Sequence, residues 1–263
     1  MKLAAAVALA ICCAAFAQEP EPPPQPSGFT FPGSTPESFK IRTGYEVSDL
    51  NSHFAYDSGA LIDFESLGLQ SHVRSYSATL SSRISRRSVI EGGFVSFDRE
   101  AHGDALREID FAGAVIPTGA PLDVSMKSRF YSLGYRYYAY DNGIVRLSGL
   151  LGITAATVDT TVNRQSANMT MRCPQLGAGV EWAVTPSIEA EMDFRGMRAN
   201  FDHFDGSMTS AALAATWFVW PNVGVGAGVN KADIRLHKYE GPDFTAQGVY
   251  NRLSAIVFLE GAF

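Results

Sequence analysis

Residues 252–263, with the sequence RLSAIVFLEGAF, decide the fold of this chain. Counting back from Phe263, every second residue as far as Leu253 is apolar or small, whereas the alternate positions include Glu260, Ser254 and Arg252. A period of two places successive side chains on opposite faces of a strand. The stretch therefore predicts a β-strand with one apolar face and one partly polar face.

The same alternation recurs upstream. Ile188, Ala190, Met192 and Phe194 share one face of a segment whose other face is ionisable, and similar patterns surround residues 145–154 and 175–182. These patterns predict an all-β chain of about ten strands, with eight as the main alternative. Residues 49–70 leave the count open, because residues 60–64 form an extra strand or the first strand pairs differently. The expected strands lie near 38–48, 71–84, 88–100, 124–140, 144–162, 168–184, 188–200, 206–220, 223–237 and 246–263.

The connections between these segments favour a membrane barrel over a β-sandwich. Short turns occur at 85–87, 141–143, 185–187 and 220–222. Longer polar loops are expected near 49–70, 101–123, 163–168, 200–206 and 238–246. Tight turns at one end and longer loops at the other are typical of an antiparallel up-and-down transmembrane β-barrel.

Aromatic residues gather beside the short turns. Rings of Trp and Tyr prefer the interface between membrane and water, so this grouping predicts a girdle at one end of a barrel. The residues assigned to the girdle are Tyr137, Tyr138, Tyr140, Trp182, Trp217, Phe218, Trp220 and Phe263.

Ionisable side chains occupy the other strand face at mid-strand. Burial in a dry sandwich core would be very unfavourable for them, whereas they can pair inside a narrow barrel whose apolar face meets lipid. A barrel of about ten strands is nearly filled by its side chains, so we expect a charge network that fills the lumen. The predicted network comprises Arg146, Glu181, Glu189, Glu191, Asp193, Arg195, Arg252 and Glu260.

The N-terminal region has a different composition. Residues 1–17 combine Lys2, an apolar run and Ala15-Phe16-Ala17, which is typical of a cleavable signal peptide. Residues 18–37 are rich in proline and are expected to form a periplasmic tail before a barrel over 38–263. Removal of the signal would leave Cys173 as the single cysteine, which excludes an intramolecular disulfide.

Together, the signal sequence, the alternating strands, the asymmetry of turns and loops and the terminal Phe263 resemble the small bacterial outer-membrane β-barrel proteins. The resemblance covers roughly 38–263. It implies an outer-membrane location, contact with outer-membrane lipid and lipopolysaccharide, and a monomeric barrel. It also implies that Phe263 belongs to the signal recognised by the barrel-assembly machinery. A shared barrel does not define a shared activity.

The sequence offers little chemistry. The net charge of −6 and the absence of basic clusters exclude a general nucleic-acid binder. No cofactor motif, catalytic set or metal-ligand spacing is present, and the histidines near the expected loops, such as His102 and His203, are read as solvated groups. We therefore expect a non-enzymatic barrel that serves envelope structure or surface interaction through its outer loops. The alternatives are a small-solute channel and a hydrolase, either a protease or a lipid A-modifying enzyme, with its site at the outer rim.

Overall fold

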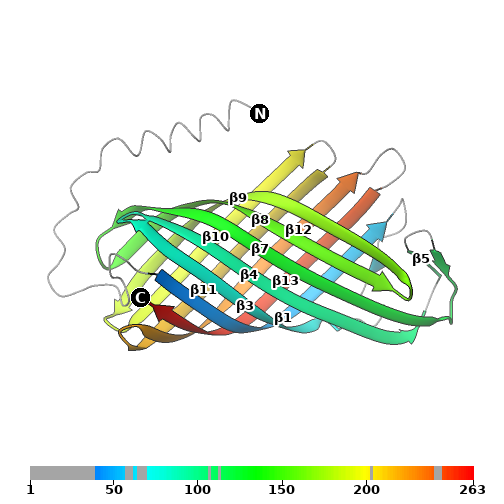
Figure 1. Ribbon diagram of the computed structural model, residues 1–263, viewed down its shortest axis with the longest axis horizontal. Helices are drawn as coiled ribbons and strands as arrows, with labels where there is room; N and C mark the ends of the chain where they lie inside the picture. The colour runs from blue at the N-terminus through cyan, green and yellow to red at the C-terminus, as the bar shows by residue number, and fades with distance from the viewer. Residues whose placement is uncertain are drawn as a thin grey trace.

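The protein forms a closed antiparallel β-barrel in the computed structural model, which describes residues 39–56, 62–63, 70–105, 108–111, 114–201, 204–239 and 245–263. The expected signal peptide and proline-rich tail lie outside these residues. Ten long strands form the wall of the described barrel (Figure 1). They are β1 (Phe39–Tyr56), β3 (His72–Ser85), β4 (Ser88–Asp104), β7 (Pro121–Asp141), β8 (Val145–Val162), β9 (Gln165–Thr185), β10 (Ile188–Phe201), β11 (Phe204–Trp220), β12 (Val223–Tyr239) and β13 (Thr245–Ala262).

Pairing between the first and last strands closes the barrel. Their register runs from Lys40↔Ala262 to Tyr56↔Ala246, and every other pair of neighbours in the wall is also antiparallel. The predicted fold and the count of ten strands are thus confirmed, and eight is excluded. No helix among the described residues is long and apolar enough to cross a membrane. The end that holds the start of β1 and the close of β13 is called the terminal end here, and the opposite end the distal end.

The connections at the distal end correct the expected loops. β1 continues to Tyr56, well into the expected loop 49–70, and residues 62–63 form the short strand β2 (Ile62–Asp63) against it rather than a strand of the wall. A small hairpin, β5 (Ile109–Phe111) with β6 (Ala114–Ile116), lies within the expected loop 101–123.

Two of the distal connections are shorter than the loops expected at 163–168 and 200–206. β8 and β9 are joined by two residues, and Asn163 there has a φ of 53°. Asparagine tolerates this left-handed conformation, which permits a tight hairpin turn. β10 ends at Phe201 and β11 begins at Phe204. The prediction overlooked that asparagine can terminate a strand pair as efficiently as glycine.

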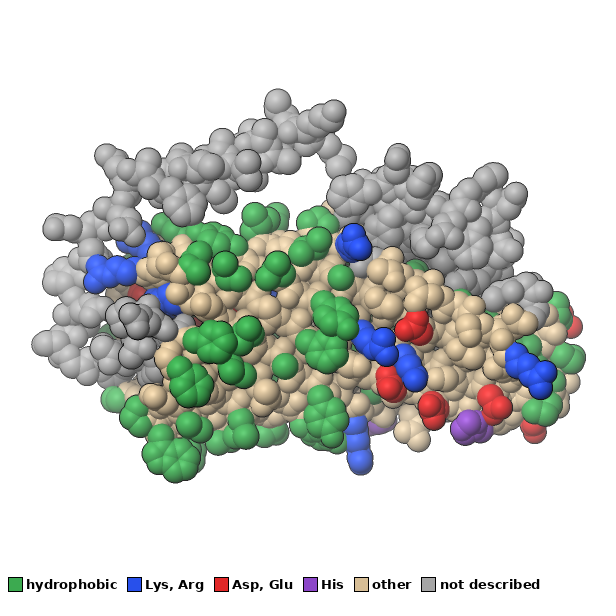
Figure 2. Space-filling view, in the orientation of Figure 1, with side chains coloured by type: hydrophobic (Ala, Val, Ile, Leu, Met, Phe, Trp, Pro, Cys, Tyr) green, Lys and Arg blue, Asp and Glu red, His purple; other side chains and the backbone are tan. Residues whose placement is uncertain are grey.

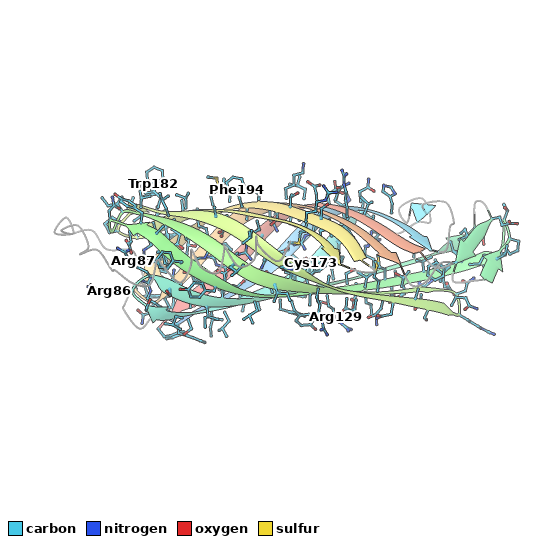
Figure 3. The ribbon with its side chains drawn as sticks, turned by 90° about the horizontal axis from the view of Figure 1, so that it is seen from above. Arg86, Arg87, Arg129, Cys173, Trp182 and Phe194 are labelled. Atoms are coloured by element: carbon cyan, nitrogen blue, oxygen red, sulfur yellow. The ribbon has the colours of Figure 1, made fainter. Side chains whose placement is uncertain are left out.

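An apolar belt surrounds the terminal half of the barrel. Leu133, Trp182, Trp217 and Leu259 are among its exposed side chains, and Figure 2 shows hydrophobic side chains gathered at that half on the visible face. Beyond the belt, the same face carries Lys, Arg, Asp, Glu and His. Figure 3 shows Trp182 and Phe194 pointing away from the barrel on one side and Arg129 on the other.

The girdle of aromatic residues is smaller than predicted. Tyr140, Trp182, Trp217, Trp220 and Phe263 are exposed near the terminal end. In contrast, Tyr138 and Phe218 are buried. Both residues continue the inward alternation of their strands, after the buried Arg136 and Thr216. A register shift follows each of them, between Tyr138 and Tyr140 and between Phe218 and Trp220, and beyond it Tyr140 and Trp220 are exposed.

The distal half is built differently from the terminal half. The register between β9 and β10 ends at Gly196↔Leu176, and that between β3 and β4 ends at Tyr76↔Ser96, although all four strands continue. The distal half therefore consists of two sheets, β4-β7-β8-β9 and β10-β11-β12-β13-β1-β3. Figure 1 shows the distal ends of β9 and β10 pointing in different directions.

Apolar side chains fill the space between these two sheets. They form one buried core to which both sheets and the β5–β6 hairpin contribute, and its members include Leu50, Val73, Phe97, Phe111, Ile116, Val124, Met126, Val158, Met169, Cys173 and Ile234. The polarity of the strands thus reverses along the barrel: the terminal half is apolar outside, and the distal half is apolar inside. We expected the charge network to fill the lumen, but it occupies only the terminal half.

Candidate functional site

A cavity of about 360 Å³ lies in the lumen of the barrel. Inward-facing side chains from strands around the wall line it, and apolar core residues such as Leu50, Phe97 and Ile234 line its distal part. The eight side chains that the sequence placed in the lumen network all line this cavity: Arg146, Glu181, Glu189, Glu191, Asp193, Arg195, Arg252 and Glu260.

Arg42 on β1 is the centre of one ion-pair group. Its Nε and Nη2 donate to Glu260 Oε2 at 3.0 and 2.6 Å, and its guanidinium also pairs with the Glu191 carboxylate. Lys40 lies beside it, with Nζ 3.4 Å from Glu260 Oε1 and 3.8 Å from Glu189 Oε1. Each cation in this group therefore serves two carboxylates.

Arg136 on β7 is the centre of a second group. Its Nε donates to Glu91 Oε2 at 3.0 Å and its Nη1 donates to Asp193 Oδ1 at 2.8 Å. Arg195 reaches the same Glu91 from across the lumen, with Nη2 3.0 Å from Oε1. Gly179 leaves room for this group, because a Cβ there would collide with the Arg136 guanidinium and the Asp193 carboxylate.

Two smaller groups complete the charge network. Arg146 lies 3.1 Å from Asp141 Oδ2 and 3.4 Å from Glu181 Oε2, and the Tyr138 hydroxyl donates to Glu181 Oε1 at 2.6 Å. The hydroxyl explains why Tyr138 faces inward rather than joining the girdle. On β13, Arg252 pairs with Glu46.

Several partners in this network lie on strands from which the sequence predicted no member. Glu191 pairs with Arg42 on β1, and Arg195 pairs with Glu91 on β4. Sequence reasoning missed the members on the early strands. They are Lys40, Arg42, Glu46, Glu91, Arg136 and Tyr138. The signal was present in residues 40–46, where the charges fall on even positions, as they do in the final strand.

The outer-rim histidines form no catalytic arrangement that the described residues show. His102 Nδ1 lies 2.7 Å from Asp123 Oδ1, and both side chains are exposed. The hydrogen bond and the charge of Asp123 raise the pKa of His102 above its usual 6.5. Among the described residues, no group of His, Cys, Asp and Glu has the arrangement of a metal site. His203, the other loop histidine named from the sequence, lies outside these residues.

The closed wall, the exterior apolar belt and the ion-paired interior define a transmembrane β-barrel of the bacterial outer-membrane class. The protein family models give no match to the sequence, and no curated protein matches it.

Solved structures of low sequence identity share this architecture. OmpT, an outer membrane protease from Escherichia coli, aligns over 87% of this chain and 98% of its own length, with a TM-score of 0.52 and 11% identity. OprG, an outer membrane protein from Pseudomonas aeruginosa, covers 89% of this chain and 99% of its own at a TM-score of 0.42 and 13% identity. Ail, the attachment invasion locus protein of Yersinia pestis, aligns over 86% of this chain and 99% of its own length, with a TM-score of 0.38 and 12% identity. At these identities, the likeness concerns the fold alone.

Proposed function

We propose that the protein is a non-enzymatic outer-membrane barrel that serves envelope structure or surface interaction through its distal half and does not conduct solutes along its axis. The observation that carries this proposal is the apolar core of the distal half. Met126, Val158 and Phe111 lie inside it at 0–1% exposure. A tightly packed core of this kind leaves no room for the water-filled pore that a porin needs.

Ion pairs in the terminal half support the same proposal. Arg42, Arg136 and Arg146 each contact two carboxylates, so the inward charges hold one another across the lumen. Inward charges that are paired with one another offer few free charges to a passing ion.

Exposed cations follow the apolar belt at its distal edge. They come from several strands, and they are Arg74, Arg129, Arg172, Arg198 and Lys231. Cations at this level suit the phosphate groups of lipopolysaccharide, because guanidinium and ammonium groups bind phosphate strongly. This position supports lipopolysaccharide as a partner and the distal half as the surface-exposed part.

Planar-bilayer recording tests the closed lumen. The full-length mature protein, refolded and inserted, should give no single-channel steps above the protein-free bilayer. An inserted porin in the same apparatus provides the positive control. Stable steps from the refolded barrel would instead favour the small-solute channel.

Assays on peptides and on lipid A test the hydrolase alternative, for which the exposed His102–Asp123 pair is the candidate group.

A further inference from the structure

The barrel wall has a break between β9 and β10. Pairing between these strands stops at Gly196↔Leu176, while β9 stays paired with β8 as far as Gln165. The next outward position on β9 is Pro174, which lacks an N–H and therefore favours an edge strand. The break begins at the distal edge of the apolar belt, because Leu176 and Phe194 are among its exposed side chains.

A groove lies on the outer face of the wall, beside this break. Leu176 and Phe194 line it together with the small residues Gly177, Ala178 and Gly196. Arg195 and Ser210 line both this groove and the cavity in the lumen. The groove and the lumen cavity therefore lie on the two sides of the same part of the wall, next to the break.

The cavity beside the break is amphipathic. Gln175 lines it at 3% exposure, and neither the oxygen nor the nitrogen of its amide has a hydrogen-bond partner. A buried polar group without a partner costs about 1–3 kcal/mol, so this amide suits a polar group brought by a ligand. Phe130, Met208 and Ile234 supply apolar surface in the same cavity.

We propose that the lumen binds a single-chain amphiphile with a carboxylate head, such as a medium-chain fatty acid, which enters from the outer leaflet through the break between β9 and β10. The head would accept hydrogen bonds from the Gln175 amide and the Arg195 guanidinium. Arg195 shares its carboxylate partner Glu91 with Arg136, and its side chain is 26% exposed, so it retains donors for a second carboxylate.

The size and position of the cavity fit this ligand. Its volume of about 360 Å³ falls in the range of roughly 300–1,000 Å³ for small-molecule pockets. The apolar chain would lie against Phe130 and Met208, and entry from the side needs no opening of the distal core. The inference goes beyond the proposed function, since a barrel that does not conduct ions can still bind a lipid from the side.

Photo-crosslinking tests the site. The full-length mature protein is refolded into phospholipid vesicles, and a dodecanoate with a diazirine near its methyl end is added and irradiated. Mass spectrometry then identifies the labelled residues. We expect label on lumen-lining residues such as Phe130 and Met208 in addition to the exterior belt. Label confined to the exterior belt would overturn the proposal.

Two tryptophan variants test the route. A Cβ on Gly196 would meet no atom within 4 Å, so Gly196→Trp can fill the groove without forcing the strand. Gly92 on β4 is the matched control position, because a Cβ there would meet only the Ser132 carbonyl oxygen, at an ordinary 3.8 Å. Gly92 pairs with the exposed belt residues Leu80 and Leu133 and does not line the groove, so Gly92→Trp adds a ring to the belt away from the break. The Gly196 variant should lose lumen label and keep belt label, whereas the control should keep both. Unchanged lumen label in folded Gly196→Trp would refute entry through this break.

Replacement of Gln175 tests the head-group contact. Gln175→Leu removes an unpartnered amide and retains volume, so the barrel should fold. Loss of one hydrogen bond should raise the dodecanoate concentration for half-maximal lumen label by roughly 3- to 10-fold. A diazirine-bearing dodecane without the carboxylate should show no such difference between wild type and variant. Equal dodecanoate dependence in both proteins would remove Gln175 from the site and overturn the proposed head-group binding.

Discussion

At the scale of single residues, the stability of the barrel rests on buried cations that each hold two acids. Arg136 is the clearest case, because it binds Glu91 and Asp193 and is itself buried. Arg136→Leu leaves two carboxylates short of a partner, and breaking a buried pair costs about 3–5 kcal/mol. Urea unfolding in lipid vesicles should show that Arg136→Leu lowers the free energy of unfolding by that amount, whereas Met192→Leu on the exterior face should change it little. An Arg136→Leu variant as stable as the wild type would mean that the barrel does not need the charge network for stability.

The His102–Asp123 pair gives a prediction for pH. The raised pKa of His102 means that the folded state favours the histidinium. Its contribution to stability is therefore fully present below the pKa of the unfolded chain and is lost as the pH rises through the folded pKa. An NMR titration of the His102 ring should give a midpoint above 6.5, and Asp123→Asn should lower that midpoint. A midpoint insensitive to Asp123→Asn would exclude the pair as the cause.

At the scale of elements, the turn between β8 and β9 shows how one residue sets a strand end. Asn163 adopts a φ of 53°, its Oδ1 accepts from the Asp123 N–H at 2.8 Å, and its Nδ2 donates to the Pro121 carbonyl at 3.1 Å. Asn163→Val should destabilise the barrel by about 1–2 kcal/mol, because a β-branched residue is strained in this conformation. Asn163→Gly should lower the free energy of unfolding by less in the same assay, because glycine adopts this conformation without strain. A valine variant as stable as the glycine variant would show that strain does not matter here.

Strand positions could be read from the sequence because alternation is a local property. Residues 188–195 keep the two faces that the sequence implied, and all ten expected segments became wall strands. The distal ends could not be read in the same way. On the distal part of β7, the buried positions are the apolar Leu122, Val124 and Met126. The exposed positions between them and just beyond them include the charged Asp123, Lys127 and Arg129. A period of two shows that a strand has an apolar face and a polar face, but it does not show which of them points into the barrel. The apolar face is outside in the terminal half and inside in the distal half, so the core between the two sheets was missed.

At the scale of the whole molecule, the closure of the wall explains why partners in the lumen escaped prediction. Arg42 and Glu191 are far apart in the chain and meet only because β1 pairs with β13 and the lumen is narrow. Local patterns give the face of each residue, whereas the shape of the closed barrel decides which charges face each other. The break at Gly196↔Leu176 is likewise a property of two strands together, although Pro174 marks its position in the sequence.

Phe263 is expected to matter more for assembly than any loop histidine. Its backbone N–H donates to the Phe39 carbonyl at 2.9 Å, and its carbonyl accepts from the Phe39 N–H at 2.7 Å, which locks the seam between the first and last strands. Deleting Phe263 should lower the amount of protein in the outer-membrane fraction, as measured by immunoblot against a His102→Ala control. Equal amounts from both variants would remove Phe263 from the assembly signal.

The closed wall also predicts heat-modifiable migration. Seventeen register pairs join β1 to β13, so no strand edge is open along the seam, and with Cys173 as the single described cysteine, hydrogen bonds and packing must maintain closure. Strand pairs of this kind persist in detergent until heated. Unboiled protein from the outer membrane should therefore run at a different position from boiled protein on a denaturing gel. The Arg136→Leu variant should convert between the two positions at a lower temperature than wild type, because Asp193 loses its partner Arg136 and Glu91 keeps only Arg195. Identical migration before and after boiling would contradict a closed barrel, whereas equal conversion temperatures would place the stability of the wall in strand pairing alone.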